Sequence, residues 1–326
     1  MPGRIVILTE NREQAVAAIK AVGGRPRDRG GYFKHGEAAV LWLAGHTLEF
    51  LSPAAIDLQA WGGPRDRAAF PILPDPIPRA FSRDVHLRAR IASLKTALKT
   101  AEEVVIATDA DREGALIGLE PLDVLGFAGR RSRIVYDSVD PRAIAAALKD
   151  KQPIARTEAQ ARAAYARAVI DWWFGMGPSR ACTLLFNRDG QAAPVSVGRV
   201  QTPTLAMIVE REEARAAFRP QSYYEVVATV DGTELVLRYS PRGDGEDGGQ
   251  GRILDRAQAE AIGAAVEGMT ARVALASLPG KPRRHLFTLE SLQKMAAARW
   301  GWRADKTKTV AEALRLAGSI TYVRTD

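Results

Sequence analysis

The sequence has 326 residues, of which 46% are hydrophobic and 26% are charged, a composition typical of globular proteins. This length exceeds one ordinary hydrophobic core, so two or three domains are expected. The formal net charge of +8 and the pI near 9.7 indicate a possible polyanion binder, although the basic excess is moderate.

The single cysteine and the N-terminal sequence exclude several classes of protein. The single cysteine, Cys182, excludes an internal disulfide and a cysteine-based zinc site, and we expect it to be a buried small apolar residue. The N-terminus lacks the layout of a signal peptide, and no apolar run is long enough to span a bilayer. The sequence therefore predicts a cytoplasmic protein that does not associate with a membrane.

The first half of the chain alternates short apolar strands with amphipathic helices. Strands are expected at 4–9, 38–44, 104–106 and 133–139, and helices at 84–101, 115–126 and 141–149. The proline-rich residues 64–78 are expected to form a loop, within a less regular region from 25 to 85. Alternation of this kind up to about residue 150 predicts an α/β fold, with a mostly parallel sheet and helices on its faces.

Three acids, Asp109, Asp111 and Glu113, follow the strand at 104–106. An open α/β sheet places its site beyond the carboxyl ends of its strands. Three acids so close together repel one another and call for a cation, and oxygen ligands alone suit Mg²⁺. A solvated acidic turn is the alternative, and a bare D-x-D-x-E motif favours it. Glu10, after the first strand, could join the cluster or could be an acid favoured by the dipole of the next helix.

The pattern becomes helical after residue 153. A helix is expected from 157 to 174, ending before Gly175, with Trp172 and Trp173 in the core and not serving as a stacking platform. A basic loop, 194–201, then leads into a helix at 205–217. Arg199 and Gln201 stand at this helix start, where backbone N–H groups could help them to bind a phosphate.

The last third begins as a small β-rich module. Strands are expected at 223–230, 233–239 and 270–276, and helices at 255–266, 288–300 and 307–316, with an acidic, glycine-rich insert at 243–251. The chain then reaches Tyr322 and Arg324, which a strand would point in the same direction.

Motifs spread over the whole chain resemble those of one family, the type IA DNA topoisomerases, and within it the topoisomerase III branch. The matching segments are the D-x-D-x-E-G run from Asp109 to Gly114, Glu10 after the first strand, Gly45-His46 with Leu48-Glu49, Asp171-Trp172 with Gly175 and Arg180, SVGRVQTPTL at 196–205, and ITYVRTD at 320–326. The resemblance implies a multidomain α/β and α+β fold. Its expected parts are a TOPRIM (Rossmann-like) metal-binding domain at 1–153, a helical DNA-binding domain at 154–220, a partial β-rich arch at 221–280, and the beginning of a tyrosine-bearing helical domain at 281–326.

The activity implied by the resemblance is that of a DNA topoisomerase, an isomerase. Tyr322 would cleave single-stranded DNA and form a 5′-phosphotyrosyl link, and a second strand would pass through the break. Religation would need no ATP. The outcome would be relaxation of negative supercoils or decatenation of linked DNA molecules. Arg324 would hold the phosphate, and Glu10 would act as general acid or as a metal ligand. Asp109, Asp111, Glu113 and Glu10 would bind Mg²⁺, and the DNA-binding residues would be Arg180, Ser196, Arg199 and Gln201.

The resemblance also implies partners and a location. Single-stranded or negatively supercoiled DNA is the expected partner, with a helicase as a second candidate partner, and the expected protein is a cytoplasmic monomer associated with nucleoid or plasmid. Three departures stand out: Asn11 replaces the usual Lys after the first-strand glutamate, Ala115 replaces a polar residue, and Val323 replaces a proline.

Other classes of protein remain as rivals. TOPRIM acids also occur in primases, nucleases and recombination proteins, but the segments at 196–205 and 320–326 have no place in those. A nucleotide-binding α/β protein would need a glycine-rich phosphate loop. The serious alternative is a truncated topoisomerase that binds single-stranded DNA without relaxing it, because the sequence stops four residues after Tyr322.

Overall fold

The computed structural model describes residues 4–62, 70–186, 193–233, 235–239, 252–270 and 286–321. The chain divides into two compact units, one formed by 1–202 with 285–326 and the other by 203–284. The four-part division expected from the sequence stays a prediction. Within the described residues, no helix has the length and apolar character that crossing a membrane requires.

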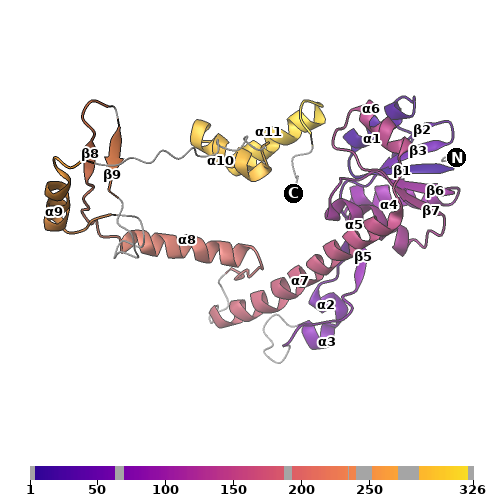
Figure 1. Cartoon of the computed structure of the whole chain (residues 1–326). Helices are drawn as coiled ribbons and strands as arrows, with labels where there is room; N and C mark the ends of the chain where they lie inside the picture. Colours follow the sequence, from indigo (N-terminus) through magenta and orange to yellow (C-terminus); the bar gives the residue numbers. More distant parts are fainter. Residues whose placement is uncertain are drawn as a thin grey trace. The chain divides into compact units, whose positions relative to one another are not determined.

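The first unit contains a five-stranded sheet (Figure 1). Its strands lie in the order β2 (Tyr32–His35), β3 (Ala38–Trp42), β1 (Ile5–Thr9), β6 (Glu103–Ile106) and β7 (Arg130–Arg133). All neighbours pair in parallel except β2, which is antiparallel to β3. The predicted α/β fold with a mostly parallel sheet is therefore confirmed.

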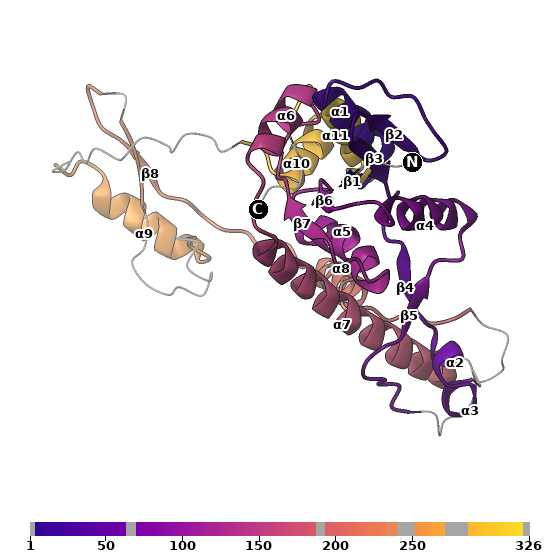
Figure 2. The same ribbon diagram turned by 90° about the vertical axis from the view of Figure 1, so that its right-hand side faces the viewer.

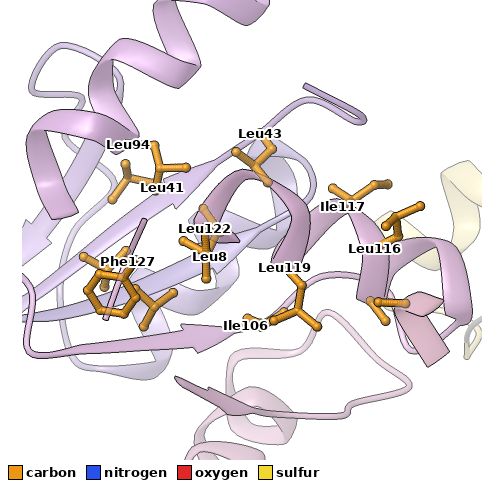
Figure 3. Packing of buried hydrophobic residues seen from close by; sticks show 14 of the residues in the cluster. Leu8, Leu41, Leu43, Leu94, Ile106, Leu116, Ile117, Leu119, Leu122 and Phe127 are labelled. Carbon is orange, nitrogen blue, oxygen red and sulfur yellow. The ribbon is translucent and has the colours of Figure 1, made fainter. Parts of the chain in front are cut away.

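Helices cover both faces of this sheet, because apolar side chains of the central strands point alternately to one face and to the other. Val6 and Leu8 face one side of β1 and Ile7 faces the other, as a period of two requires. The Val6 side packs against α4 (Val85–Leu98), α5 (Arg112–Val124) and α7 (Ile154–Phe186), as the buried cluster in Figure 3 shows for the first two. The Ile7 side packs against α1 (Arg12–Ala21) and α6 (Pro141–Lys149).

The observed helix starts agree with the predicted ones where the sequence contains a capping residue. Asp84 caps α4, Asp140 caps α6 with Pro141 at its first position, and Asn11 caps α1 through a capping box with Gln14. The predicted helix at 141–149 has the observed bounds. The region 25–85, predicted to be less regular, also contains β2, the antiparallel pair β4 (Leu48–Phe50) and β5 (Arg79–Phe81), and the short helices α2 (Pro53–Ile56) and α3 (Leu58–Trp61).

Two predicted elements were wrong. The strand expected at 133–139 is β7 at Arg130–Arg133, and the apolar residues Ile134 and Val139 after it are buried in the same cluster as Ile7. The helix expected to end before Gly175 continues as α7 to Phe186, through Pro178. Figure 2 shows the far half of α7 beside α2 and α3, and Arg180 there donates to the Trp61 carbonyl at 2.8 Å. Tertiary contacts thus hold this half helical against the glycine and proline signals.

The expected roles of two other residues can also be compared with the structure. Trp172 is buried against Ile72 and Ile77, and its indole N–H donates to the Leu51 carbonyl, so the core interpretation is confirmed for this residue. Cys182, expected to be buried, is only half-buried.

The remaining elements are short. α10 (Leu289–Trp300) and α11 (Ala304–Leu316) form a helical hairpin in the first unit. The second unit holds most of α8 (Gln201–Ala216), the antiparallel pair β8 (Val227–Thr229) and β9 (Val236–Arg238), and α9 (Arg256–Val266). The strand expected at 270–276, apart from residue 270, and the insert at 243–251 lie outside the described residues.

Candidate active site

The acidic loop lies between β6 and α5, at the carboxyl end of a central parallel strand. Asp111 caps α5, and its Oδ1 accepts from the Gly114 N–H at 2.7 Å. The Thr108 hydroxyl donates to the Gly114 carbonyl at 2.5 Å. Glycine is required at 114 because an added Cβ would lie 2.2 Å from the Asp109 carbonyl oxygen. The loop is thus folded tightly onto the first turn of the helix.

Glu10 meets this loop because β1 and β6 are parallel neighbours. Its Oε2 accepts from the Asp109 N–H at 3.4 Å. Gln14, which sequence reasoning did not single out, ties the two acids together: its Nε2 donates to Asp109 Oδ1 at 2.6 Å, and its Oε1 accepts from the Glu10 and Asn11 N–H groups at 3.0 and 3.2 Å. Glu10 and Asp109, far apart in sequence, therefore share one hydrogen-bond network.

A buried arginine lies beneath the loop. Arg133, with 2% of its surface exposed, donates to the Thr108 hydroxyl at 2.6 Å and to the Asp109 carbonyl. Burial lowers the pKa of the Arg133 guanidinium, while the neighbouring carboxylates act in the opposite direction. A guanidinium keeps its proton under such conditions, so Arg133 supplies fixed positive charge below the acids.

The Asp109 side chain is more enclosed than that of Glu113, with 14% of its surface exposed against 35%. Burial raises the pKa of its carboxyl, and the nearby charge of Asp111 adds to this effect. Arg315 of α11 acts in the opposite direction, with Nη1 at 3.6 Å from Asp109 Oδ1. The Arg315 side chain is almost fully buried and also donates to Glu312, at 2.9 and 2.5 Å. Sequence reasoning missed Arg315 because it sits on the inward stripe of α11, where an apolar residue is expected.

Glu113 faces away from this network. Its Oε2 lies 3.4 Å from His46 Nε2, and its Oε1 lies 3.5 Å from Arg167 Nη1. Arg167 also reaches Asp171, with Nε at 3.7 Å from Oδ2. His46, which we expected to be a hydrogen-bonded or surface residue, thus belongs to the rim of the acidic loop.

The predicted metal ligands have the donor chemistry of a hard divalent cation, because all of them are carboxylates. Glu10 and Asp109 lie together, Asp111 caps α5, and Glu113 pairs with His46 and Arg167. In the described part of the chain, no three acidic, histidine or cysteine side chains gather closely enough to hold a metal ion. The donor chemistry thus suits a hard divalent cation, but in this arrangement Glu10, Asp111 and Glu113 are engaged with groups of the protein itself.

The predicted DNA-binding residues lie along the second half of α7 and the start of α8. Arg199 forms a two-point pair with Asp171, through Nε to Oδ1 at 2.7 Å and Nη2 to Oδ2 at 3.3 Å. This hydrogen bond and the charge of Asp171 raise the pKa of Arg199. Gln201, the first residue of α8, donates to the Ser196 hydroxyl at 2.7 Å.

The loop that carries these residues is fastened to α7 by hydroxyl groups. The Ser179 hydroxyl accepts from the Val197 N–H at 2.8 Å, and the Thr183 hydroxyl accepts from the Val195 N–H at 2.9 Å. Arg180 points into the protein, where it donates to the Trp61 carbonyl, and its Nη1 is buried without a hydrogen-bond partner among the described residues. Tyr322 and Arg324 lie outside the described residues.

Two family models match this chain in sequence order. A model of the Toprim domain matches residues 5–136, and a model of DNA topoisomerase matches residues 155–326. The first match contains Glu10 and the acidic loop, and the second contains the α7–α8 segment and residue 322.

Individual relatives show the same likeness. DNA topoisomerase 3 of Bacillus subtilis (strain 168) is 30% identical over 302 residues, which cover 91% of this chain and 39% of that protein. DNA topoisomerase 3 of Shouchella clausii (strain KSM-K16) is 30% identical over 316 residues, 94% of this chain and 41% of that protein. The chain thus spans about two fifths of the length of these relatives. The fold resembles that of full-length topoisomerase I from Thermotoga maritima, with a TM-score of 0.63 at 22% identity, over 98% of this chain and 49% of that one.

Proposed function

This chain belongs to the type IA DNA topoisomerase family, and from that premise we propose that it cleaves and rejoins single-stranded DNA through a covalent link to Tyr322. The observation that carries the proposal is the presence of both family matches on one chain, in the order Toprim domain and then topoisomerase segment. The chain spans about two fifths of the length of these relatives. Relaxation and strand passage are therefore proposed for a full-length protein of this family.

The reaction is a transesterification. The Tyr322 hydroxyl loses its proton to solvent as its oxygen attacks a backbone phosphorus, a tyrosyl O–P bond forms, and the bond to the 3′-oxygen breaks. The leaving 3′-oxygen takes a proton, for which Glu10 is the proposed donor, and the phosphate stays on Tyr322 as a 5′-phosphotyrosyl ester. Reversal restores the phosphodiester without ATP, since the ester preserves the bond energy. A tyrosine of ordinary pKa, near 10, is a weak nucleophile, so Arg324 is proposed to offset charge at the phosphate.

The Toprim domain binds a divalent metal, and Mg²⁺ is the ion that we propose here. The ion would offset phosphate charge and orient the scissile region when bound by Asp109, Asp111 and Glu113, and Glu10 is a fourth ligand only in the alternative in which it does not supply the proton. Gln14 supports this role because it holds Asp109 beside Glu10 from a fully buried position. Arg133 supports it by fixing the loop from below.

DNA would be held along the α7–α8 segment. Arg199 is the leading candidate for a phosphate contact, because Asp171 already orients its guanidinium and more than a third of the side chain is exposed. Gln201 and Ser196 lie next to it and offer polar groups. Arg180 is proposed to act indirectly, through the α2–α3 segment to which it donates. Single-stranded or negatively supercoiled DNA remains the proposed substrate, a monomer the proposed state, and a helicase a proposed partner.

A covalent-adduct assay tests the proposal. The 326-residue chain is mixed with a single-stranded oligonucleotide and Mg²⁺, quenched with detergent and separated by gel electrophoresis. We expect an adduct that disappears in Tyr322→Phe and persists in the matched control Tyr239→Phe, which changes an exposed tyrosine of the second unit. Adduct without relaxation of negatively supercoiled plasmid would identify a cleavage-competent fragment. The absence of adduct in the unmodified chain would reject the proposed cleavage activity.

A further inference from the structure

Two tryptophans lie side by side at the turn between α10 and α11. Trp300 ends α10 and Trp302 follows one residue later, and their ring centroids are 5.3 Å apart with planes tilted by 40°. Gly301 between them has φ +63°, the left-handed conformation that ends a helix and that residues with a side chain rarely adopt. Its N–H and that of Trp302 bond back to carbonyls of the last turn of α10. The turn therefore fixes both rings in one patch.

The pair is flanked by cations. The Lys306 ammonium lies 4.4 Å from the Trp302 ring centroid, and the Arg299 guanidinium lies 5.6 Å from the Trp300 ring centroid. Residues 299–308 contain four basic side chains and one acidic one. Of the basic groups, Arg303 is paired with Asp305 at 3.4 Å. The rings thus sit in a locally positive surface.

Trp300 differs in solvent exposure from Trp172, whose role in a core cluster the fold explains. Trp172 is buried in a core cluster, whereas 52% of the Trp300 surface is exposed. Leaving so large an apolar ring half in water is unfavourable unless a partner covers it. A nucleobase is a suitable partner, because every base presents a flat π-face and carries its own phosphate to the neighbouring cations.

We propose that Trp300 and Trp302 form a stacking platform for unpaired bases of single-stranded DNA, with Arg299 and Lys306 contacting the adjacent phosphates. This inference rests on the proposed function, which supplies single-stranded DNA as the ligand. The hairpin gives the platform a fixed position: Gln293 of α10 donates to the Ala304 carbonyl at the start of α11, at 3.1 Å. α11 leads in sequence to residue 322, so the platform would hold bases on the part of the sequence that carries the proposed nucleophile.

The test separates base stacking from phosphate attraction. Binding of the 326-residue chain to fluorescently labelled oligothymidylate, and to an abasic strand of the same length, is followed by anisotropy. We expect the unmodified chain to prefer the thymidylate strand. Trp300→Leu should weaken thymidylate binding about fivefold or more, the lower range for the loss of one stacked base, and leave abasic binding unchanged.

Three further variants control the result. Phe287→Leu removes an exposed aromatic ring just before α10 and should leave both affinities unchanged. Lys306→Gln should weaken both strands to a similar extent and reduce the dependence of binding on salt, because it removes a charge. Trp302→Phe keeps a ring at the half-buried position and should retain part of the preference, and circular dichroism checks that the hairpin stays folded.

The failures are distinguishable. If the unmodified chain binds single-stranded DNA but does not distinguish bases from abasic sites, the platform is rejected and the proposed function survives. The platform is also rejected if Trp300→Leu keeps the full preference, in which case the rings pack against protein. If neither strand binds, the proposed substrate is rejected, and the platform falls with it.

Discussion

Gly114→Ala is the change that most directly tests the geometry of the acidic loop. An added Cβ would lie 2.2 Å from the Asp109 carbonyl oxygen and 2.9 Å from the Asp109 backbone carbon and nitrogen. Ordinary contact would need more than about 1 Å of additional separation. The clash is with backbone, so no side-chain rotation can relieve it, and either Asp109 or the first turn of α5 must move.

The expected magnitude follows from two opposing effects. Alanine in place of a helical glycine normally stabilises by about 1 kcal/mol, because it restricts the unfolded chain. Overpacking against backbone costs about 1–3 kcal/mol. We therefore expect a net loss of up to about 2 kcal/mol in the free energy of unfolding. Because Asp109 carries the hydrogen bond to Glu10, displacement by about 1 Å should also lower the rate of adduct formation by up to about 100-fold.

Urea unfolding and the covalent-adduct assay measure these two effects. The matched control is Gly263→Ala in α9, where an added Cβ meets nothing within 4 Å. That variant should be more stable by about 0.5–1 kcal/mol and should form adduct at the rate of the unmodified chain. If Gly114→Ala were at least as stable as the unmodified chain and equally active, the close packing of the loop on α5 would be refuted.

Further predictions concern the scaffold, the DNA contact and the metal. Burial opposes ionisation of Glu103, but hydrogen bonds from Lys151, Ser132 and Arg130 outweigh it and lower its pKa. The stability from this lowered pKa is complete above the ordinary glutamate pKa, about 4.3, and is lost as pH falls through the folded-state value. Glu103→Gln should therefore cost about 1–3 kcal/mol in urea unfolding at pH 7 and less in acid; an equal cost at both pH values would contradict this. Arg199→Gln should weaken single-stranded DNA binding and reduce its salt slope by about one, with Arg256→Gln, an exposed arginine of α9, as the unchanged control. Asp109→Asn should weaken Mg²⁺ binding about tenfold or more in calorimetry, with Asp123→Asn as control; unchanged affinity would remove Asp109 from the ligand set.

The parallel sheet was predictable because hydrophobic pattern and helix caps agreed. Val6, Ile7 and Leu8 form a continuous apolar run, which is the pattern of a strand covered on both faces, and Asp140-Pro141 marks a helix start. For Glu10 the sequence left two alternatives, and the structure favours proximity to the acidic loop because β1 and β6 are parallel neighbours that end at the same edge. Local signals and tertiary structure point to the same answer at these positions.

The prediction failed where tertiary contacts outweighed local pattern. β7 consists of Arg130, Arg131, Ser132 and Arg133, a polar run without strand propensity. Two of its side chains are held by the buried carboxylate of Glu103, which has a hydrogen bond to each of Arg130 and Ser132. Arg133 is buried with hydrogen bonds from Nη1 to Thr108 and from Nη2 to the Asp109 carbonyl, while its Nε has no partner among the described residues, and no single-sequence rule expects a buried arginine. Gln14 was missed because its partner Asp109 lies far away in sequence, and Arg315 was missed because it occupies the inward stripe of α11.

The charged groups of the first unit fall into two energetic classes, and the difference bears on how the site can work. Glu103 and Arg133 are almost fully buried, and removing a partner from such a group costs about 3–5 kcal/mol, so these contacts fix the scaffold. The chain of pairs from Glu113 through Arg167 and Asp171 to Arg199 is at least one-third exposed at every member. Exposed pairs contribute about 0–1 kcal/mol each, so exchanging a carboxylate partner for a phosphate or a metal ion costs little. A site for a polyanion needs charged side chains that are already oriented and that exchange partners at a small cost in free energy. The exposed pairs from Glu113 to Arg199 have both properties.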